Sequence, residues 1–263
     1  MQKLLNYFGK EFPGSNIKSI GDISWAHAVN SQEKLNRYLN DGKTMMLESD
    51  VGISPAGEII LVHPKSDIKL DNKGNVISAY QPGTESDLSF EQLLKKLRYS
   101  KQGMKFDFKD PEILIDCLKM IRSASLVQPI LLNADILPGN GMQGARFNAA
   151  AFIALCQKYL PRGILSIGWT TMADDKYSYT AKNIDDMLAL CQGVETATFP
   201  VRACLMPGSW NDLKRLIQKE NYTLSIWNNE PVTEKQIEFL KTTDRSKCFY
   251  DFIDDKKEPL KLL

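Results

Sequence analysis

The residues best suited to chemistry lie in the stretch LESDVGISPAGEIILVH, residues 47–63. Glu48 and Asp50 stand two positions apart directly after an apolar run, and His63 closes the stretch. His63 and His27 are the only two histidines in the sequence. Carboxylates are good ligands for hard cations, and histidine exchanges protons near neutral pH because its unperturbed pKa is about 6.5. This pattern predicts a metal site flanked by an acid/base pair.

Further polar residues alternate with apolar ones in two later segments. In MKFDFK (104–109), Lys105, Asp107 and Lys109 alternate with phenylalanines, and Asn133 stands two positions before Asp135. Residues two positions apart point to the same face of a β-strand, so each set is expected to share one face. We predict that substrate is bound by residues near the ends of these and later segments, namely Lys109, Asn133, Asp135, Trp169, Arg202 and Trp227.

Asp107 brings the candidate metal ligands to three. Glu48, Asp50 and Asp107 offer only oxygen donors, a set that suits one divalent cation, Mg²⁺ or Ca²⁺, and does not favour zinc. Lys109 and Arg202 would place positive charge beside an anionic substrate. A hard divalent ion together with cationic side chains is the usual arrangement for stabilising the charge of a phosphoryl group.

The elements that must position these residues recur at steady intervals. Apolar, β-branched or aromatic runs predict eight strands, at residues 22–28, 44–51, 104–109, 129–137, 164–171, 197–205, 222–229 and 248–253. Segments with a 3.6-residue period predict helices at residues 31–42, 89–100, 110–125, 147–160, 183–193, 209–221 and 233–243. This alternation favours an α/β fold, a closed (β/α)8 TIM barrel whose strands all end at one mouth. No glycine-rich GxGxxG follows the first strand, which argues against a dinucleotide-binding fold.

One irregular insert, residues 54–84, interrupts this rhythm. It is predicted to form a hairpin-like excursion followed by a loop over the barrel mouth, which would bring His63 back to face His27 across the site. Because the chain has no linker-like segment and no charge block, it is expected to form a single TIM-barrel domain over residues 1–263.

Composition narrows the classes of partner. With 33 basic and 32 acidic residues, the chain is expected to bind no nucleic acid and to make at most peripheral contact with a membrane. No stretch approaches the roughly 18–20 apolar residues that span a bilayer, and the opening MQKLLNYFGKEFPGSNIKS lacks the apolar run of a secretory signal. The five scattered cysteines show no CxxC spacing, which indicates reduced core thiols. These features predict a cytoplasmic protein and leave its oligomeric state open.

The order of the candidate residues resembles that of the glycerophosphodiester phosphodiesterase-like barrels, which belong to the PLC-like phosphodiesterase superfamily. The signature of that group is His, then Glu-x-Asp, then His, and His27, Glu48, Asp50 and His63 match it. The resemblance implies that the two histidines act as general acid and base and that the Glu and Asp bind the divalent metal. It also implies that Asp107 is the further acid on the third strand.

The menorin family, a eukaryotic group with the same barrel, gives a closer resemblance, from about residue 20 to 253. The motifs that carry it are SWAHAVNS, ESDV, HP, GMKFDFKDPE, LNADILPG, LSIGWTT, TFPVRACL, LSIWN and FYDF. The pair Asp107 and Lys109 is also similar to the Asp-x-Lys of the spider-venom sphingomyelinase D branch. One position departs from the phosphodiesterases, whose first histidine is usually followed by a phosphate-binding arginine. Ala28 stands there, as in menorin-like sequences, and Arg202 or Lys109 are the candidate substitutes.

Each of these assignments has a structural alternative. The two histidines could be bonded to backbone carbonyls, and the three acids could form a salt-bridged network with Lys105, Lys109 and Arg202. The asparagine and aspartate of the fourth strand could be hydrogen-bonded strand ends. The two candidate tryptophans could pack in the core, where otherwise an indole would lie along an acyl or alcohol group of the substrate.

Two functions remain from this pattern. The first is a metal-dependent phosphodiesterase that acts on a small phosphodiester or a lipid head group, of the glycerophosphodiester or lysophospholipid type, with the two histidines as acid and base. The second is a catalytically silent barrel that binds a ligand or a protein. Ala28 favours the second function, whereas the presence of both histidines and all three acids favours the first.

Overall fold

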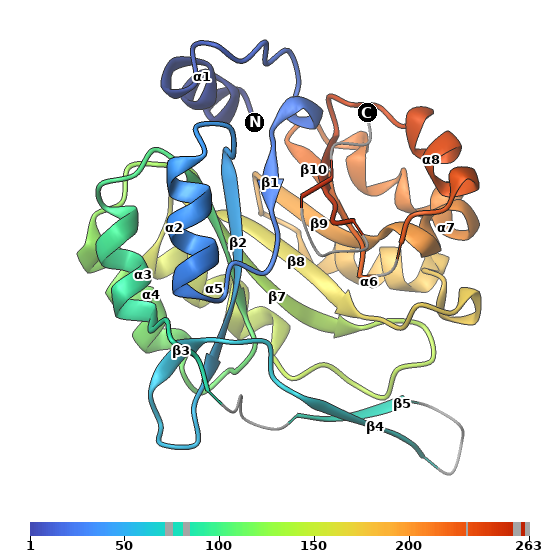
Figure 1. Ribbon diagram of the computed structural model, residues 1–263. Helices are drawn as coiled ribbons and strands as arrows, with labels where there is room; N and C mark the ends of the chain where they lie inside the picture. The colour runs from blue at the N-terminus through green and yellow to red at the C-terminus, as the bar shows by residue number, and fades with distance from the viewer. Residues whose placement is uncertain (72–75, 81–84, 230, 255–258, 261–263) are drawn as a thin grey trace.

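The computed structural model describes residues 1–71, 76–80, 85–229, 231–254 and 259–260. Within these ranges, eight parallel strands pair side by side in chain order (Figure 1). They are β1 (Trp25–Ala26), β2 (Met46–Ile53), β6 (Gly103–Phe108), β7 (Ile130–Pro138), β8 (Ile164–Thr170), β9 (Ala197–Arg202), β10 (Tyr222–Trp227) and β11 (Cys248–Asp251). The predicted (β/α)8 barrel is confirmed, and every predicted strand segment overlaps one of these strands, although β2, β6 and β7 extend one or two residues beyond the predicted bounds.

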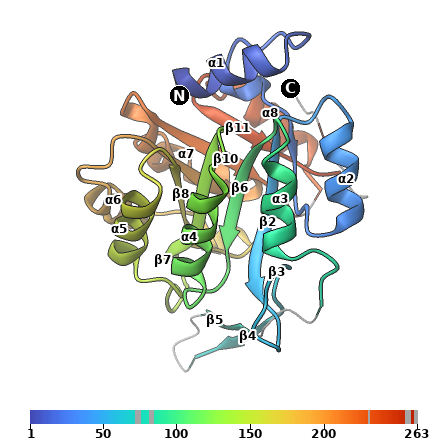
Figure 2. The same cartoon turned by 90° about the vertical axis from the view of Figure 1, so that its left-hand side faces the viewer.

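Helices cover the outside of the sheet (Figures 1 and 2). They are α2 (Gln32–Asn40), α3 (Phe90–Leu97), α4 (Leu114–Ala124), α5 (Ala149–Tyr159), α6 (Ala181–Leu190), α7 (Met206–Leu213) and α8 (Glu234–Lys241). The prediction of one continuous helix over 209–221 was wrong. Helix α7 begins earlier, with Pro207 in its first turn where proline is favoured, and a separate 3-10 turn covers Leu216–Gln218.

The amino-terminal end of the barrel is closed by a helix that the periodicity did not predict. Helix α1 (Gln2–Glu11) lies across the end where the strands begin (Figures 1 and 2). Its buried Leu4 and Phe8 belong to a small apolar cluster with residues from the amino-terminal ends of the strands, including Met46, Leu131 and Phe249. This cluster forms the floor of the barrel and leaves the opposite end open.

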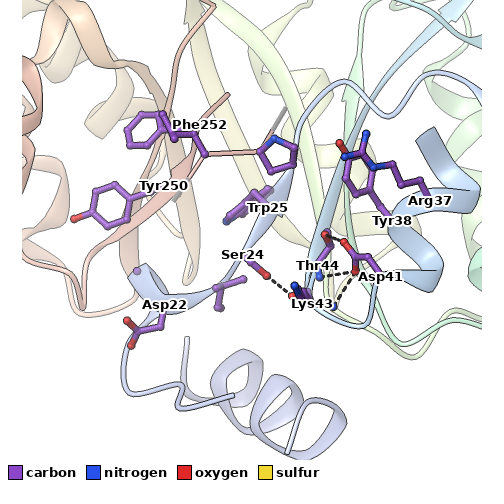
Figure 3. Close-up of a pocket in the computed structure, with 14 residues that line it drawn as sticks. Asp22, Ser24, Trp25, Arg37, Tyr38, Asp41, Lys43, Thr44, Tyr250 and Phe252 are labelled. Carbon is purple, nitrogen blue, oxygen red and sulfur yellow. Dashed lines mark hydrogen bonds between the residues drawn. The ribbon is translucent and has the colours of Figure 1, made fainter. Parts of the chain in front are cut away.

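The barrel is nearly closed at its seam. No ladder joins β1 to β11 in the part of the chain that the structure describes, although Trp25 packs edge-on against Phe249 with ring centroids 5.6 Å apart. A cavity of about 510 Å³ lies at this seam, between Tyr38 on one side and Tyr250 on the other (Figure 3). It is separate from the barrel mouth.

The insert after β2 lies beyond the carboxyl ends of the strands. Strand β3 (Ile59–Leu61) folds back antiparallel onto β2, and β4 (Ser66–Leu70) pairs with β5 (Val76–Tyr80) as a hairpin next to the mouth (Figure 1). The predicted excursion is therefore present, while residues 81–84 of the predicted loop lie outside the described residues.

Replacing Gly103 by alanine tests the packing of the barrel floor. A Cβ at Gly103 would overlap Met46 and lie 2.9 Å from Phe8 Cζ and 3.1 Å from the Pro129 carbonyl oxygen. Because overpacking of a filled core costs about 1–3 kcal/mol, we expect Gly103→Ala to lower the free energy of unfolding by that amount in urea denaturation. A Cβ at Gly9 of α1 meets nothing within 4 Å, so the control Gly9→Ala is expected to be neutral or stabilising by up to about 1 kcal/mol. Equal stabilities of the two variants would contradict this account of the floor.

Candidate active site at the barrel mouth

The register between β2 and β6 brings the three predicted metal ligands together. Glu48 pairs with Lys105 and Asp50 pairs with Asp107, so their inward-facing side chains lie in adjacent layers of the barrel. One carboxylate oxygen each from Glu48, Asp50 and Asp107 lies within 4.8 Å of the others. Three hard oxygen donors at this spacing fit a cation such as Mg²⁺ or Ca²⁺. The donor set therefore suits the ion that the sequence predicts.

Lys109 bridges two of these acids. Its Nζ lies 2.9 Å from Asp50 Oδ1 and 2.7 Å from Asp107 Oδ2. Asn30 fixes the other side of Asp50, because its Nδ2 donates to Asp50 Oδ2 at 2.7 Å. Burial opposes ionisation of Asp50, but the Lys109 ammonium and His63 outweigh it and lower the pKa of this carboxyl. Asp50 is thus held as a carboxylate.

Glu48 is buried beneath the other two acids. Its Oε2 accepts the backbone N–H of Ala28 at 2.7 Å. Burial raises the pKa of Glu48 to about 7; His27 opposes this and Asp50 adds to it. Ala28 adopts a φ of 51°, in the left-handed region that non-glycine residues seldom occupy. Ala28 therefore contributes a backbone donor in a strained conformation to the site.

His27 is anchored by a carboxylate from the opposite end of the chain. Its Nδ1 lies 3.0 Å from Asp251 Oδ2 and 3.6 Å from Glu48 Oε2. A carboxylate only accepts, so Nδ1 carries the hydrogen and Nε2 is left for other partners. Burial lowers the pKa of His27, but Asp251 and Glu48 outweigh it and raise the pKa to about 9. His27 is therefore protonated at neutral pH.

His63 lies after β3 and is more exposed. Its Nδ1 lies 2.9 Å from the carbonyl oxygen of Pro64, so Nδ1 is the donor and Nε2 again remains for other partners. His27 and His63 line one cavity of about 610 Å³, together with Glu48, Asp50 and Asp107. The five residues of the predicted catalytic and metal sets thus meet at the barrel mouth.

The structure places the predicted substrate-binding residues in different surroundings. Asn133 donates to Asp107 Oδ1 at 2.7 Å and accepts the Ser166 hydroxyl at 2.6 Å, which favours the alternative of a strand-end network. Asp135 lines the cavity. Desolvation raises its pKa to about 7, and the neighbouring Asp107 carboxylate adds to the effect. Lys109 also lines the cavity.

Two tryptophans take different places. Trp227 lines the cavity, and the Arg202 guanidinium carbon lies 4.7 Å from the centre of its ring. Trp169 is only 2 % exposed and packs against Tyr179 and Phe199 with ring centroids 5.3 and 6.4 Å away. The packing alternative therefore holds for Trp169. In β8 the inward positions are Ser166, Gly168 and Thr170, so Trp169 points outward.

Three further residues at the mouth were not among the predicted site residues. Asp251 holds His27, and the buried Lys105 lines the cavity between Glu48 and Asp107. Arg146 lines it too, with its guanidinium donating to the Lys109 carbonyl at 2.8 Å. Asp251 had a signal in the sequence, since it ends the last strand as the other acids end theirs. Arg146 lies in the glycine-rich loop after the fourth strand, where barrel enzymes place functional side chains.

Replacing Asp251 by asparagine tests the control of His27. Because the chain has two histidines, a two-dimensional NMR titration in EDTA resolves both imidazoles. We expect His27 to titrate near pH 9 in the wild type, and Asp251→Asn to bring it toward its ordinary 6.5.

The same shift predicts a pH dependence of stability. The folded pKa of His27 lies above the unfolded one, so this stabilisation is complete below about pH 6.5 and is lost as the pH rises through about 9. Asp251→Asn should remove that dependence. An unchanged titration in the variant would show that Asp251 does not control His27.

In the described residues, no helix has both the length and the apolar character needed to cross a membrane.

Comparisons with known proteins agree with the observed fold. The chain is 27% identical to human protein FAM151B over 252 residues, which covers 91% of this chain and 86% of the relative. Among solved structures, it is similar to a protein of Silicibacter pomeroyi DSS-3 that is provisionally assigned as a glycerophosphoryl diester phosphodiesterase. The TM-score is 0.52 at 11% identity, over 97% of this chain and 95% of that one.

A second solved structure, the glycerophosphodiester phosphodiesterase of Agrobacterium tumefaciens str.C58, has a TM-score of 0.49 at 12% identity, over 88% of this chain and 96% of that one. At such identities the likeness of the solved structures concerns the fold. The family model of the menorin N-terminal domain matches residues 20–257. With the barrel and the order of its motifs already in place, this match establishes that the chain belongs to the menorin family.

Proposed function

We propose that this protein is a metal-dependent phosphodiesterase that cleaves a glycerophosphodiester or lysophospholipid-type substrate. The observation that carries the proposal is the composition of a single cavity. It is lined by three carboxylates with oxygen atoms within 4.8 Å of one another and by both histidines of the chain. A barrel that served only as a scaffold would have no need to bury Glu48 and Asp50 at its mouth, since buried charges without a task are costly.

The two histidines suit different steps. His27 is protonated at neutral pH through Asp251, so it serves as the general acid and gives its Nε2 proton to the leaving alcohol. Nδ1 of His63 donates to the Pro64 carbonyl, so Nε2 is the acceptor in its neutral imidazole, and we assign His63 the role of general base. It removes a proton from water or from a hydroxyl of the substrate. The freed oxygen attacks phosphorus, and the bond from phosphorus to the leaving alcohol breaks.

The divalent cation would be held by Glu48, Asp50 and Asp107. When bound, it would supply positive charge to a non-bridging phosphate oxygen. Lys109 and Arg202, which line the same cavity, would offset the remaining negative charge of the phosphodiester. Together with Arg146 they offer cationic side chains in place of the arginine that is absent at Ala28.

A binding barrel without turnover is the second candidate, and one observation favours it. Lys109 already compensates two of the three acids, with Nζ to carboxylate distances of 2.9 and 2.7 Å. A mouth that is neutralised by its own lysine needs no metal. Metal binding therefore separates the two candidates.

Thermal denaturation of EDTA-treated protein measures that binding. A ligand at about 100 times its Kd that binds only the folded state adds about 2.7 kcal/mol of stability. For a domain of this size, this corresponds to a rise in Tm of about 5–10 °C. We expect such a rise with Mg²⁺ or Ca²⁺ and its loss in Asp107→Asn. The control Asp116→Asn, at an exposed position of α4, should keep the rise. No shift with either ion would favour the binding barrel.

Hydrolysis of bis(p-nitrophenyl) phosphate tests the chemistry. We expect turnover with Mg²⁺ or Ca²⁺ that EDTA abolishes. Because a positioned acid or base contributes about 10²- to 10⁴-fold, His27→Ala and His63→Ala should each lower kcat/KM by a factor in that range. Asp107→Ala should abolish the metal dependence, whereas Lys119→Met, on the exposed surface of α4, should match the wild type. Turnover that survives in both histidine variants would exclude the acid/base roles.

A further inference from the structure

The cavity at the mouth has two chemically different halves. The carboxylates come from β2 and β6, the second and third strands in the order around the barrel. The sixth and seventh strands, β9 and β10, lie four places further on and so face them across the mouth. From that side Pro200 and Trp227 line the cavity, and Met142 and Met172 extend it from the loops after β7 and β8. Met142, Met172, Pro200 and Trp227 form an apolar patch, here called the apolar half, and Gln143, Arg202 and Asn229 line the cavity beside it.

The side chains of this apolar half suit an aliphatic ligand. Met142, Met172 and Trp227 are partly exposed in the concave surface. Methionine side chains are flexible and adapt to irregular apolar shapes, and an indole offers a broad apolar face. Apolar walls with a few converging polar groups are typical of small-molecule sites. A substrate with two small polar alcohols would leave this wall in contact with water.

The apolar half is held in place before any ligand binds. The loop after β7, which carries Met142, is tied to β8: Gly139 donates its N–H to the Thr170 carbonyl at 3.1 Å, and the Thr170 hydroxyl donates to the Gly144 carbonyl at 3.3 Å. Its far end is tied to the segment after β6 through Arg146, which donates to the Lys109 carbonyl at 2.8 Å. A preformed wall lowers the entropy that binding must overcome.

A cation marks the boundary between the halves. The Arg202 guanidinium lies over the Trp227 ring, 4.7 Å from its centre, and both line the cavity. This places positive charge directly beside apolar surface. A phosphate ester of an aliphatic alcohol has the matching arrangement, with an anion next to a hydrocarbon chain.

We propose that Met142, Met172 and Trp227 form a subsite for one aliphatic chain, so that the preferred substrate is a single-chain amphiphilic phosphodiester. The part of this inference that concerns substrate turnover rests on the proposed phosphodiesterase function. The subsite itself is a binding site and can be tested without turnover.

A series of p-nitrophenyl alkyl phosphates with methyl, butyl and octyl groups, each below its critical micelle concentration, tests the kinetic form. Burial of one methylene is worth about fourfold in affinity at most, so partial burial of the chain predicts at least a tenfold rise in kcat/KM from methyl to octyl. In the double variant Met142→Gln and Met172→Gln the octyl-to-methyl ratio should fall about tenfold. Met120→Gln, a methionine of α4 that packs against the core, should leave the ratio unchanged. Equal kcat/KM along the series, with turnover present, would overturn the subsite and leave the phosphodiesterase function standing.

Calorimetric titration separates the subsite from catalysis. The probes are methyl octyl phosphate and dimethyl phosphate, which carry the same single charge. We expect the octyl compound to bind the wild type at least tenfold more tightly than dimethyl phosphate, and the double variant to lose this preference. That result supports the subsite even if no ester is cleaved, whereas equal affinities for the two probes would overturn it.

Discussion

Charge compensation at the barrel mouth is the constraint on which the rest of the site depends. The parallel register of β2 and β6 sets Glu48 beside Lys105 and Asp50 beside Asp107. Buried charges of this kind are tolerated only where opposite charges and hydrogen bonds compensate them, and loss of one partner costs several kcal/mol. Lys109 between two acids and His27 between two others supply that compensation. The same pairs allow the mouth to hold four buried or partly buried acids close together.

The two histidines lie on different elements and have different hydrogen-bond partners. His27 follows the shortest barrel strand and is enclosed by Glu48 and Asp251, which hold its proton. His63 belongs to the insert after β2 and makes its hydrogen bond to a backbone carbonyl. Ala28, with its strained φ, lies just after β1. Strand β1 borders the seam where the first and last strands of the barrel meet.

Strands and loops contribute different parts of the mouth. The acids lie on β2 and β6, whose ladder is continuous. The apolar half of the cavity comes largely from loops after β7 and β8, where residues such as Met142 and Met172 can change without disturbing the barrel. This division is general for (β/α)8 barrels.

The sequence by itself determined the strands and most of the helices. It also predicted that Glu48, Asp50, Asp107 and both histidines lie at one mouth. These features rest on short-range periodicity and on the rule that parallel strands end on one side. Only the tertiary structure decided that Asp251 holds His27, that Lys109 bridges two acids and that α1 forms the floor. It also decided which tryptophan reaches the cavity, since that depends on the phase of each strand in the closed barrel. Asp251 and His27 are 224 residues apart, and no local pattern encodes which strand ends meet when a sheet closes on itself.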